Sequence, residues 1–427
     1  MTVVATPHLR RLGFAMAATS LAVIASVTLV PQSGVPTGSH FCLVCGSLGT
    51  VDATLNVLLF VPLGFALALA GASGKRTVLA VCALSLLIEI TQYLAIAGRY
   101  STVGDVVMNT LGGALGFALA RYFTSLLNPQ RGVARGLVAG WSVIWLVVQT
   151  VSNFGIAVTL PRGQYYGQIA RNLLHFVPFR GAVIDARVGG VPTPNTRVNN
   201  SAELRSTLLN GAQVSATVIP PGPSNGIAPI FRIVDGEGRE ITLVAQVEDD
   251  MVFGVRTGAE ILRLRPLLFT LPNAFARTRS RSDFSSDTLR LSGQYTADKV
   301  IMEAGDGAAR NEAYFLPTAA LGWTFWLPFQ WFVEGTRTES WISFLWSFCL
   351  AIPLGYWLLH WQRVEHAMSG TARVASTVLF SIGVLGVGLV VVPYVYGTST
   401  APLRDWTASI SGLLAGLLLG RRAQAQT

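Results

Sequence analysis

Long apolar runs occupy both ends of the chain, and a polar stretch separates them. Each run has about the 20 residues that a helix needs to cross a hydrocarbon layer of roughly 30 Å. The pattern therefore predicts about eight membrane-spanning helices, five before the polar stretch and three after it. The first five are expected near residues 12–31, 54–72, 77–96, 105–121 and 136–154.

The polar stretch between the apolar runs has a different pattern, in which short segments alternate apolar and polar residues. Pro, Gly and acidic turns such as Asp235-Gly236-Glu237-Gly238 separate these segments. Alternation with a period of two and frequent turn signals is typical of an antiparallel β-sandwich. The predicted strands are Val214–Ile219, Pro229–Val234, Ile241–Val247, Met251–Arg256, Thr288–Tyr295 and Val300–Glu303.

The predicted fold is a polytopic α-helical membrane protein with an inserted all-β sandwich domain. We expect a membrane unit over residues 1–154, an extracytoplasmic sandwich over 155–312, and a second membrane unit over 313–427. The apolar segment 313–333 is expected not to cross the membrane. A crossing there would place the basic loops that follow it on the outer side, against the positive-inside rule.

Charge is distributed in a way that favours this topology. The chain carries a net charge of +9, with 51% hydrophobic and 12% charged residues. Much of the excess lies in short loops beside the apolar runs, as at Arg10, Arg11, Lys75, Arg76 and Arg121. This arrangement predicts a multi-pass membrane protein whose basic loops lie in the cytoplasm and whose sandwich lies outside. It leaves no basic surface for a nucleic acid.

Polar residues interrupt the apolar runs in the first membrane unit. Glu89 and Gln92 are three residues apart and share one helical face, and Asp105 and Asn109 are four apart on the next helix. Arg99 lies in the short turn between these helices. Charged groups in a membrane are costly unless they are paired or have a function. We expect Arg99 to face both carboxylates, and Asn56, at the outer end of the second helix, to join them or to bond a neighbouring helix.

An ordered set of residues in this unit resembles the core motif of the VanZ-like family of polytopic bacterial membrane proteins, over residues 40–125. The set comprises Asn56, Phe60, Pro62, Gly64, Glu89, Gln92, Arg99, Asp105, Asn109, Gly112 and Gly116. The family takes its name from a glycopeptide-resistance accessory protein, and the resemblance implies an envelope function without naming a reaction. Residues 230–257 also resemble strands of a laminin-G or concanavalin-like jelly roll.

The last hundred residues resemble the first unit in a reduced form. Asp405, Gly412 and Gly416 follow Asp105, Gly112 and Gly116 at a constant offset of 300, and Pro353-Leu354-Gly355 matches Pro62-Leu63-Gly64. In both copies Pro and Gly are expected to serve helix packing. Ser399 and Ser409 stand where the first copy has Arg99 and Asn109. This internal repeat predicts that the first unit carries the site and the second is its scaffold.

Cysteines and other reactive residues add little chemistry. For Cys42 and Cys45, which follow His40, a zinc site is disfavoured because no fourth ligand is nearby. A disulfide is favoured over zinc, and unpaired thiols are favoured over both. We predict no metal site and no cofactor. The sequence has no phosphate-binding Gly-rich loop, no serine or cysteine nucleophile constellation and no HExxH motif.

Three functions fit the predicted architecture. The first is a protein that binds a lipid headgroup or a lipid-linked cell-wall precursor through its membrane core, while the sandwich contacts a surface glycan or a partner. Such a protein would be linked to antibiotic or envelope-stress resistance. The second is an intramembrane enzyme acting on a lipid-linked substrate, and the third is a transporter. The predicted partners are membrane lipids, and whether any reaction is catalysed stays open.

Overall fold

The computed structural model describes residues 6–31, 41–99, 101–173, 176–276, 288–305, 310–362 and 370–425. Two compact units are present, and each is described by itself. Unit 1 comprises residues 1–138, 356–366 and 417–427, and unit 2 comprises residues 139–355 and 367–416. Helices α5, α9 and α12 run through the boundaries between these ranges.

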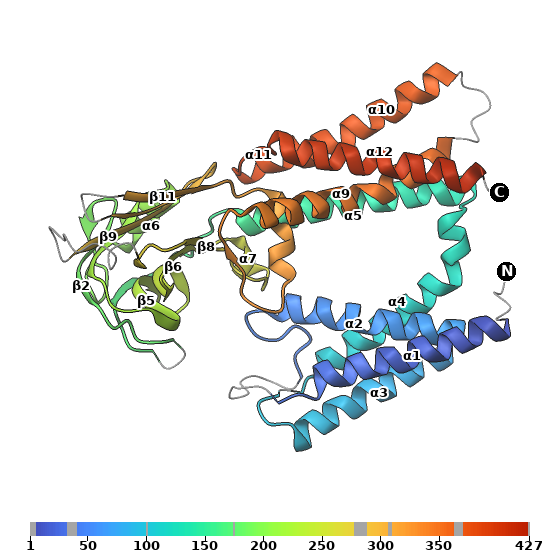
Figure 1. The fold of residues 1–427 in the computed structure, drawn as a ribbon, viewed down its shortest axis with the longest axis horizontal. Coiled ribbons are helices and arrows are strands. Elements are labelled where there is room, and N and C mark those ends of the chain that lie inside the picture. The colour runs from blue at the N-terminus through green and yellow to red at the C-terminus, as the bar shows by residue number, and fades with distance from the viewer. Residues whose placement is uncertain are drawn as a thin grey trace. The chain divides into compact units, whose positions relative to one another are not determined.

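Unit 1 is built on four long helices, α1 (Pro7–Thr28), α2 (Gly49–Leu69), α3 (Gly74–Ala95) and α4 (Val103–Leu127) (Figure 1). Side-chain oxygens cap three of them, which satisfies backbone N–H groups that have no partner within the helix. Thr6 accepts from the backbone N of Leu9, and Ser73 accepts from that of Arg76. Thr102 does the same for Asp105 at the start of α4.

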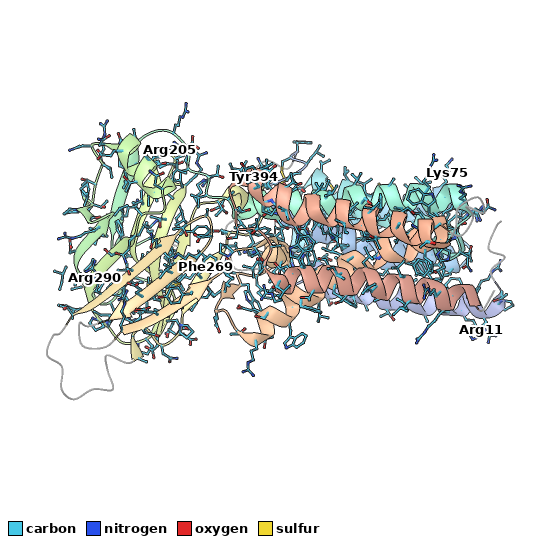
Figure 2. The ribbon with its side chains drawn as sticks, turned by 90° about the horizontal axis from the view of Figure 1, so that it is seen from above. Arg11, Lys75, Arg205, Phe269, Arg290 and Tyr394 are labelled. Carbon is cyan, nitrogen blue, oxygen red and sulfur yellow. A yellow bond between two sulfur atoms is a disulfide. The ribbon has the colours of Figure 1, made fainter. Side chains whose placement is uncertain are left out.

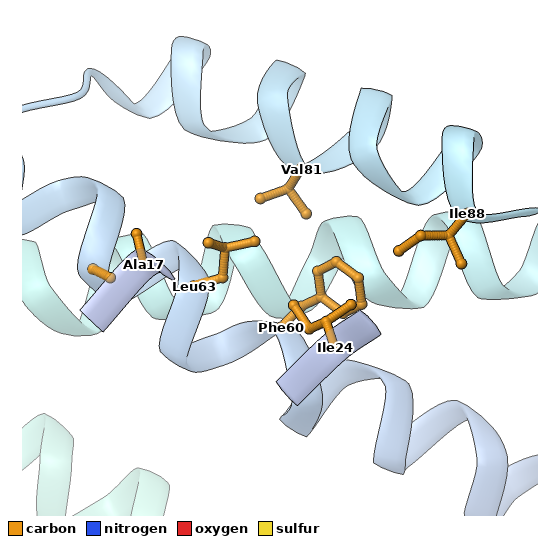
Figure 3. Packing of buried hydrophobic residues seen from close by; sticks show 7 residues of the cluster. Ala17, Ile24, Phe60, Leu63, Val81 and Ile88 are labelled. Atoms are coloured by element: carbon orange, nitrogen blue, oxygen red, sulfur yellow. The ribbon is translucent and has the colours of Figure 1, made fainter. Parts of the chain in front are cut away.

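Apolar side chains from α1, α2 and α3 form the core of unit 1. Ile24 of α1, Phe60 of α2 and Val81 of α3 are at most 1% exposed and pack in one cluster (Figure 3). The basic residues Arg11 and Lys75 lie at the same end of this bundle (Figure 2). The opposite end is formed by the last residues of α1 and α3 and the first residues of α4.

Unit 2 contains most of α5 (Arg131–Ile156), α9 (Arg337–Gln362) and α12 (Leu403–Ala425), together with α10 (Gly370–Gly386). The last is continued by the π-helical turn η2 (Val387–Val391) and by α11 (Val392–Tyr396). Trp145, Leu385 and Leu389 form a buried cluster. The indole nitrogen of Trp141 donates to the carbonyl of Leu350 at 2.8 Å, which ties α5 to α9.

Seven helical segments in the described part of the chain are long and apolar enough to cross a membrane. They are α1, α2, α3, α4, α5, α9 and the continuous segment Ala375–Tyr396. The eighth predicted span, α12, is a helix of 23 residues but is not among the seven, because charged residues lie near both its ends. A multi-pass helical protein is therefore confirmed, with one fewer clear span than predicted.

The segment 313–333 forms no long helix, as expected. It holds the end of strand β11 (Arg310–Phe315), the eight-residue 3-10 helix η1 (Ala319–Trp326) and the short strand β12 (Phe332–Val333). Eight residues are far too few to cross a membrane. Strand β11 also continues three residues beyond the predicted end of the sandwich.

The inserted domain consists of two six-stranded sheets. The first has the order β1 (Tyr165–Ile169), β5 (Ser224–Asp235), β6 (Glu240–Glu248), β7 (Asp250–Val255), β8 (Leu268–Leu271), β12. The second has the order β11, β10 (Val300–Gly305), β9 (Leu289–Tyr295), β4 (Val214–Ile219), β2 (Ala182–Val188), β3 (Val191–Pro192). All pairings between these strands are antiparallel except that of β8 with β12. The short helices α6 (Ser201–Leu209) and α7 (Gly258–Ile261) complete the domain.

Aromatic side chains hold the two sheets together. Phe269 of the first sheet packs edge-on against Tyr295 of the second, with ring centroids 5.9 Å apart, and also contacts Phe315. All six predicted strands lie within observed strands or extend past them by one residue. The predicted turn at Asp235 is closed by its carboxylate, which accepts from the backbone N of Glu237 and of Arg239, both at 2.9 Å.

Candidate functional site

Six polar residues of unit 1, called the polar cluster below, lie toward the bundle end remote from Arg11 and Lys75. They are Asn56, Glu89, Gln92, Arg99, Asp105 and Asn109. Glu89, Gln92 and Asn109 are at most 7% exposed. Asn56, Arg99 and Asp105 are half-buried. The polar cluster thus extends from the interior of the helix bundle to its end.

Asp105 and Asn56 make the direct contact between α4 and α2. The side-chain amide of Asn56 donates to Oδ1 of Asp105 at 2.6 Å. The backbone N of Asp105 donates to Oγ1 of Thr102 at 3.1 Å, which fixes the first turn of α4. This bond agrees with both interpretations left open for Asn56, because Asp105 belongs to the polar cluster and also lies on a neighbouring helix.

Glu89 and Gln92 connect α3 to two different neighbours. One carboxylate oxygen of Glu89 accepts from the backbone N of Thr102 at 2.9 Å, immediately before α4. The amide of Gln92 donates to the backbone carbonyl of Thr28 at 2.9 Å, at the end of α1. Because both side chains are buried, these bonds satisfy groups that would otherwise be costly to bury.

Arg99 contacts α1 and makes no ion pair with either carboxylate among the described residues. Its Nε donates to the carbonyl of Val30 at 3.1 Å, and one terminal nitrogen donates to the carbonyl of Val27. Burial lowers the pKa of Arg99 from its ordinary value, and the charges of Asp105 and Glu89 oppose this shift. Arg99 therefore faces both carboxylates electrostatically, while its hydrogen bonds go to backbone carbonyls. The cation caps the C-terminal carbonyls of α1, which attract positive charge, and stays near the carboxylates.

Asn109 lies deeper in the bundle. Its amide nitrogen donates to the hydroxyl of Ser85 on α3 at 2.8 Å, and the pair is almost fully buried. Its carbonyl oxygen is buried and has no hydrogen-bond partner in the described part of the protein. An unsatisfied buried acceptor is uncommon and is one feature that a bound ligand or water would explain.

Glycines place α4 directly against α2. A Cβ atom built on Gly112 would lie 2.2 Å from the carbonyl oxygen of Val57, and one on Gly116 would lie 2.0 Å from that of Val61. Gly64 is equally tight against the carbonyl of Gly113, at 2.0 Å. Pro62 lies inside α2 without ending it. This backbone contact positions Asn56 next to Asp105.

A disulfide links Cys42 and Cys45, so the expectation of unpaired thiols is wrong. The loop that it closes lies against the start of α4. The backbone N of Gly104 donates to the carbonyl of Cys42 at 3.1 Å. A Cβ on Gly104 would be 2.4 Å from the carbonyl oxygen of Leu43. The disulfide loop therefore supports the segment that carries Thr102 and Asp105.

The sequence alone did not reveal three residues that complete the cluster, namely Thr28, Ser85 and Thr102. Thr102 had a detectable signal, because Thr three residues before an acidic residue is typical of a helix start. Ser85 and the carbonyl of Thr28 had none, since their role depends on which helices are neighbours. The described residues contain no group of three or more His, Cys, Asp or Glu side chains that could hold a metal ion.

The fold and this site define a multi-pass helical membrane protein with a buried polar cluster and an inserted β domain. Residues 13–128 match the model of the VanZ/LLP1 family, which confirms the resemblance for this part of the chain. No protein of curated function and no solved structure matches the chain. The likeness of the sandwich to lectin folds therefore stays a prediction.

Proposed function

We propose that the polar cluster binds the phosphate-bearing headgroup of a membrane lipid or of a lipid-linked cell-wall precursor. The observation that carries the proposal is the half-buried Arg99 at the end of the bundle. Two of its nitrogens donate to carbonyls in the last turn of α1 and just after it, and the third, Nη1, makes no hydrogen bond to a described residue. A guanidinium held in this way is suited to phosphate.

The carboxylates fit the remaining chemistry of such a headgroup. Asp105 is held by Asn56, and Glu89 is held by the backbone N of Thr102. Ionised carboxylates retain further acceptor positions, which suit the hydroxyl or amine groups that accompany phosphate in headgroups. The carboxylates would thus bind the cationic or hydroxylated part of the ligand, and Arg99 would bind its phosphate.

The position of the cluster along the helices supports this ligand. Lys75 begins α3 and Gln92 lies 17 residues later, about 26 Å along a helix. If Lys75 and Arg11 lie on the cytoplasmic side, as the positive-inside rule requires, the cluster is near the outer headgroups. We accordingly place the protein in the bacterial inner membrane with its sandwich outside.

For the sandwich we propose contact with a surface glycan. A small polar hollow on it is lined by Arg180, Ser224, Asn225 and Gln246. The amide nitrogen of Gln246 donates to the carbonyls of Gly222 and Glu248, and its oxygen is left without a partner among the described residues. A sugar hydroxyl could donate to such an oxygen. Together, headgroup and glycan binding would link this protein to envelope-stress or antibiotic resistance.

Mass spectrometry of lipids retained by the purified protein tests the headgroup proposal. The wild type should retain one class of phosphate-bearing lipid selectively, and Arg99→Gln should lose it. Arg290→Gln, which removes an exposed charge from β9, serves as the control and should retain the lipid. Arg99→Lys keeps the charge but not the planar fork and should retain an intermediate amount. Equal retention by all four proteins would refute the proposal.

We also propose that the two membrane segments are copies of one unit. Gly355 on α9 would place a Cβ 2.0 Å from the carbonyl oxygen of Leu413, and Gly412 on α12 would place one 2.1 Å from that of Phe348. These pairs correspond to Gly64 with Gly113 and to Gly112 with Val57. Positions on α2 and α9 differ by 291, and positions on α4 and α12 differ by 300.

A further inference from the structure

A small cavity in unit 2 has a lining that no function above explains. Polar side chains reach it from α5, α9 and α12, and the π-helical turn η2 supplies part of the wall. Its free volume is about 10 Å³, near the space of a single water molecule or small ion. The polar residues that line it are Gln149, Asn153, Thr318, Ser347, Ser399 and Asp405.

A carboxylate is buried in this wall. The side chain of Asp405 is 4% exposed. One oxygen accepts from the hydroxyl of Thr318 at 2.9 Å, and the other is paired with Nε of Arg404 at 3.2 Å. A carboxylate has about four acceptor positions, so these two contacts leave about half of them available. Burial of an incompletely solvated carboxylate is costly unless something supplies the missing contacts.

Two further oxygen groups belong to the wall. Gln149 is 5% exposed, and its Oε1 has no hydrogen-bond partner among the described residues. Ser347 is also 5% exposed, and it lines the same cavity. The unsatisfied groups are therefore mainly acceptors, and they surround a space of ionic size.

The backbone around the cavity is irregular. Gly388 and Leu389 of the π-helical turn line it, and the carbonyl of Leu389 accepts from the backbone N of Ala401 at 3.2 Å. Such turns are rare and are often found at functional sites. Broken helices in membrane proteins likewise occur where backbone groups contact a ligand or ion.

The corresponding place in unit 1 explains how the space arises. By the offsets of 291 and 300, Ser347 corresponds to Asn56 and Asp405 corresponds to Asp105. In unit 1 the amide of Asn56 reaches Asp105 at 2.6 Å. Serine is shorter than asparagine and has no amide, so in unit 2 the carboxylate is retained while the group that satisfied it is absent.

We propose that this cavity binds a small alkali cation, Na⁺ in preference to K⁺, through oxygen atoms of Asp405, Gln149 and Ser347. Carboxylate, amide and hydroxyl oxygens are hard ligands that suit such ions. A single carboxylate, already paired with Arg404, offers too little negative charge for a divalent cation. The small free volume favours the smaller alkali ion.

The test is the thermal unfolding of the full chain in detergent, measured at equal ionic strength in NaCl, KCl and choline chloride. At tenfold excess over its dissociation constant, Na⁺ should raise Tm by about 2 °C relative to choline. The effect should saturate with Na⁺ concentration, and K⁺ should act more weakly. Equal Tm in all three salts would overturn the proposal and leave an ordinary water site, and an equal shift in KCl would overturn the size argument.

Two variants and a control localise the effect. Asp405→Asn removes the charge and should abolish the Na⁺ shift. Ser347→Asn should fill the cavity and supply the donor that Asn56 supplies in unit 1, so it should abolish the shift in a folded protein even if Asp405→Asn does not fold. Thr407→Ala, on the exposed side of α12, should keep the shift. A Na⁺ shift that persists in folded Ser347→Asn would also refute this location.

Discussion

The helix pairs α2/α4 and α9/α12 share their packing and differ in their polar residues. Each pair is joined where a glycine faces a backbone carbonyl, Gly112 with Val57 in one and Gly412 with Phe348 in the other. Yet the first pair is bordered by Glu89, Gln92 and Arg99, and the second has no equivalent of this set. Close helix packing therefore does not need the charges, which supports a binding role for them in unit 1.

Replacing the interface glycines should have the largest effect, and it should be similar in the two pairs. Gly112→Val and Gly412→Val would both force side-chain atoms into backbone carbonyls, at a cost of about 3 kcal/mol or more. Thermal unfolding in detergent, with yield of folded protein, measures this. Gly140→Ala, where a Cβ would meet nothing within 4 Å, is the control. A large loss for one glycine only would break the equivalence of the pairs.

Arg99→Ala should cause the second largest loss of stability, and it should destabilise unit 1 alone. Its two hydrogen bonds to α1 carbonyls would be lost, at about 2–3 kcal/mol. Neutralising the carboxylates in the same protein with Glu89→Gln and Asp105→Asn should restore little of this stability, because those carbonyls remain uncapped. Thermal unfolding of the single and triple variants decides the point. Full recovery in the triple variant would instead show that charge repulsion between the carboxylates dominates.

The sequence predicted the elements of this fold better than the contacts of its site. Strand β4 was predicted with its observed ends, because its alternation is regular and the turns around it are clear. Strand β2 was missed, since its outer residues are largely exposed and its pairing with β4 is irregular between Val183 and Asp185. The polar cluster was identified because a charged side chain in an apolar helix is costly unless it is paired or has a function.

The sequence alone could not predict which residues of neighbouring helices contact each other. The spacing placed Arg99 near Glu89 and Asp105, but the position of α1 decides that its nitrogens reach the carbonyls of Val27 and Val30. The disulfide was likewise undecided, because a Cys-x-x-Cys pair can bind a metal, oxidise or stay free. In the structure the two residues form a disulfide, which the spacing alone does not predict.

Reducing the disulfide should destabilise unit 1 without an equivalent in unit 2. The closed loop is short, so chain entropy predicts a loss of about 2 kcal/mol. The reductant should lower the Tm of the wild type and leave the Cys42→Ser/Cys45→Ser protein unchanged at the lower value. No response of the wild type to reductant, with the thiols shown to be free, would mean that the loop does not support α4.

Asn56→Ser and Ser347→Asn should have the smallest effects on the free energy of unfolding. The first should lower it and the second should raise it. Asn56→Ser removes the hydrogen bond to Asp105 and should cost about 1.5 kcal/mol. In choline chloride, Ser347→Asn should stabilise the protein slightly by satisfying Asp405. Thermal unfolding of each single variant and of the double variant measures both changes in stability. If Ser347→Asn destabilises as much as Asn56→Ser, the two positions are not equivalent.

Recognition of a phosphate-bearing headgroup by the polar cluster is tested most directly by ligand-induced stabilisation. A short-chain phosphatidic acid and the matching diacylglycerol differ only in the phosphate and can be added to the purified protein. We predict that only the phosphatidic acid raises the Tm of the wild type and of Arg290→Gln, in a saturable way, and that Arg99→Gln loses this response. Equal stabilisation by both lipids, or an undiminished response in Arg99→Gln, would contradict the account.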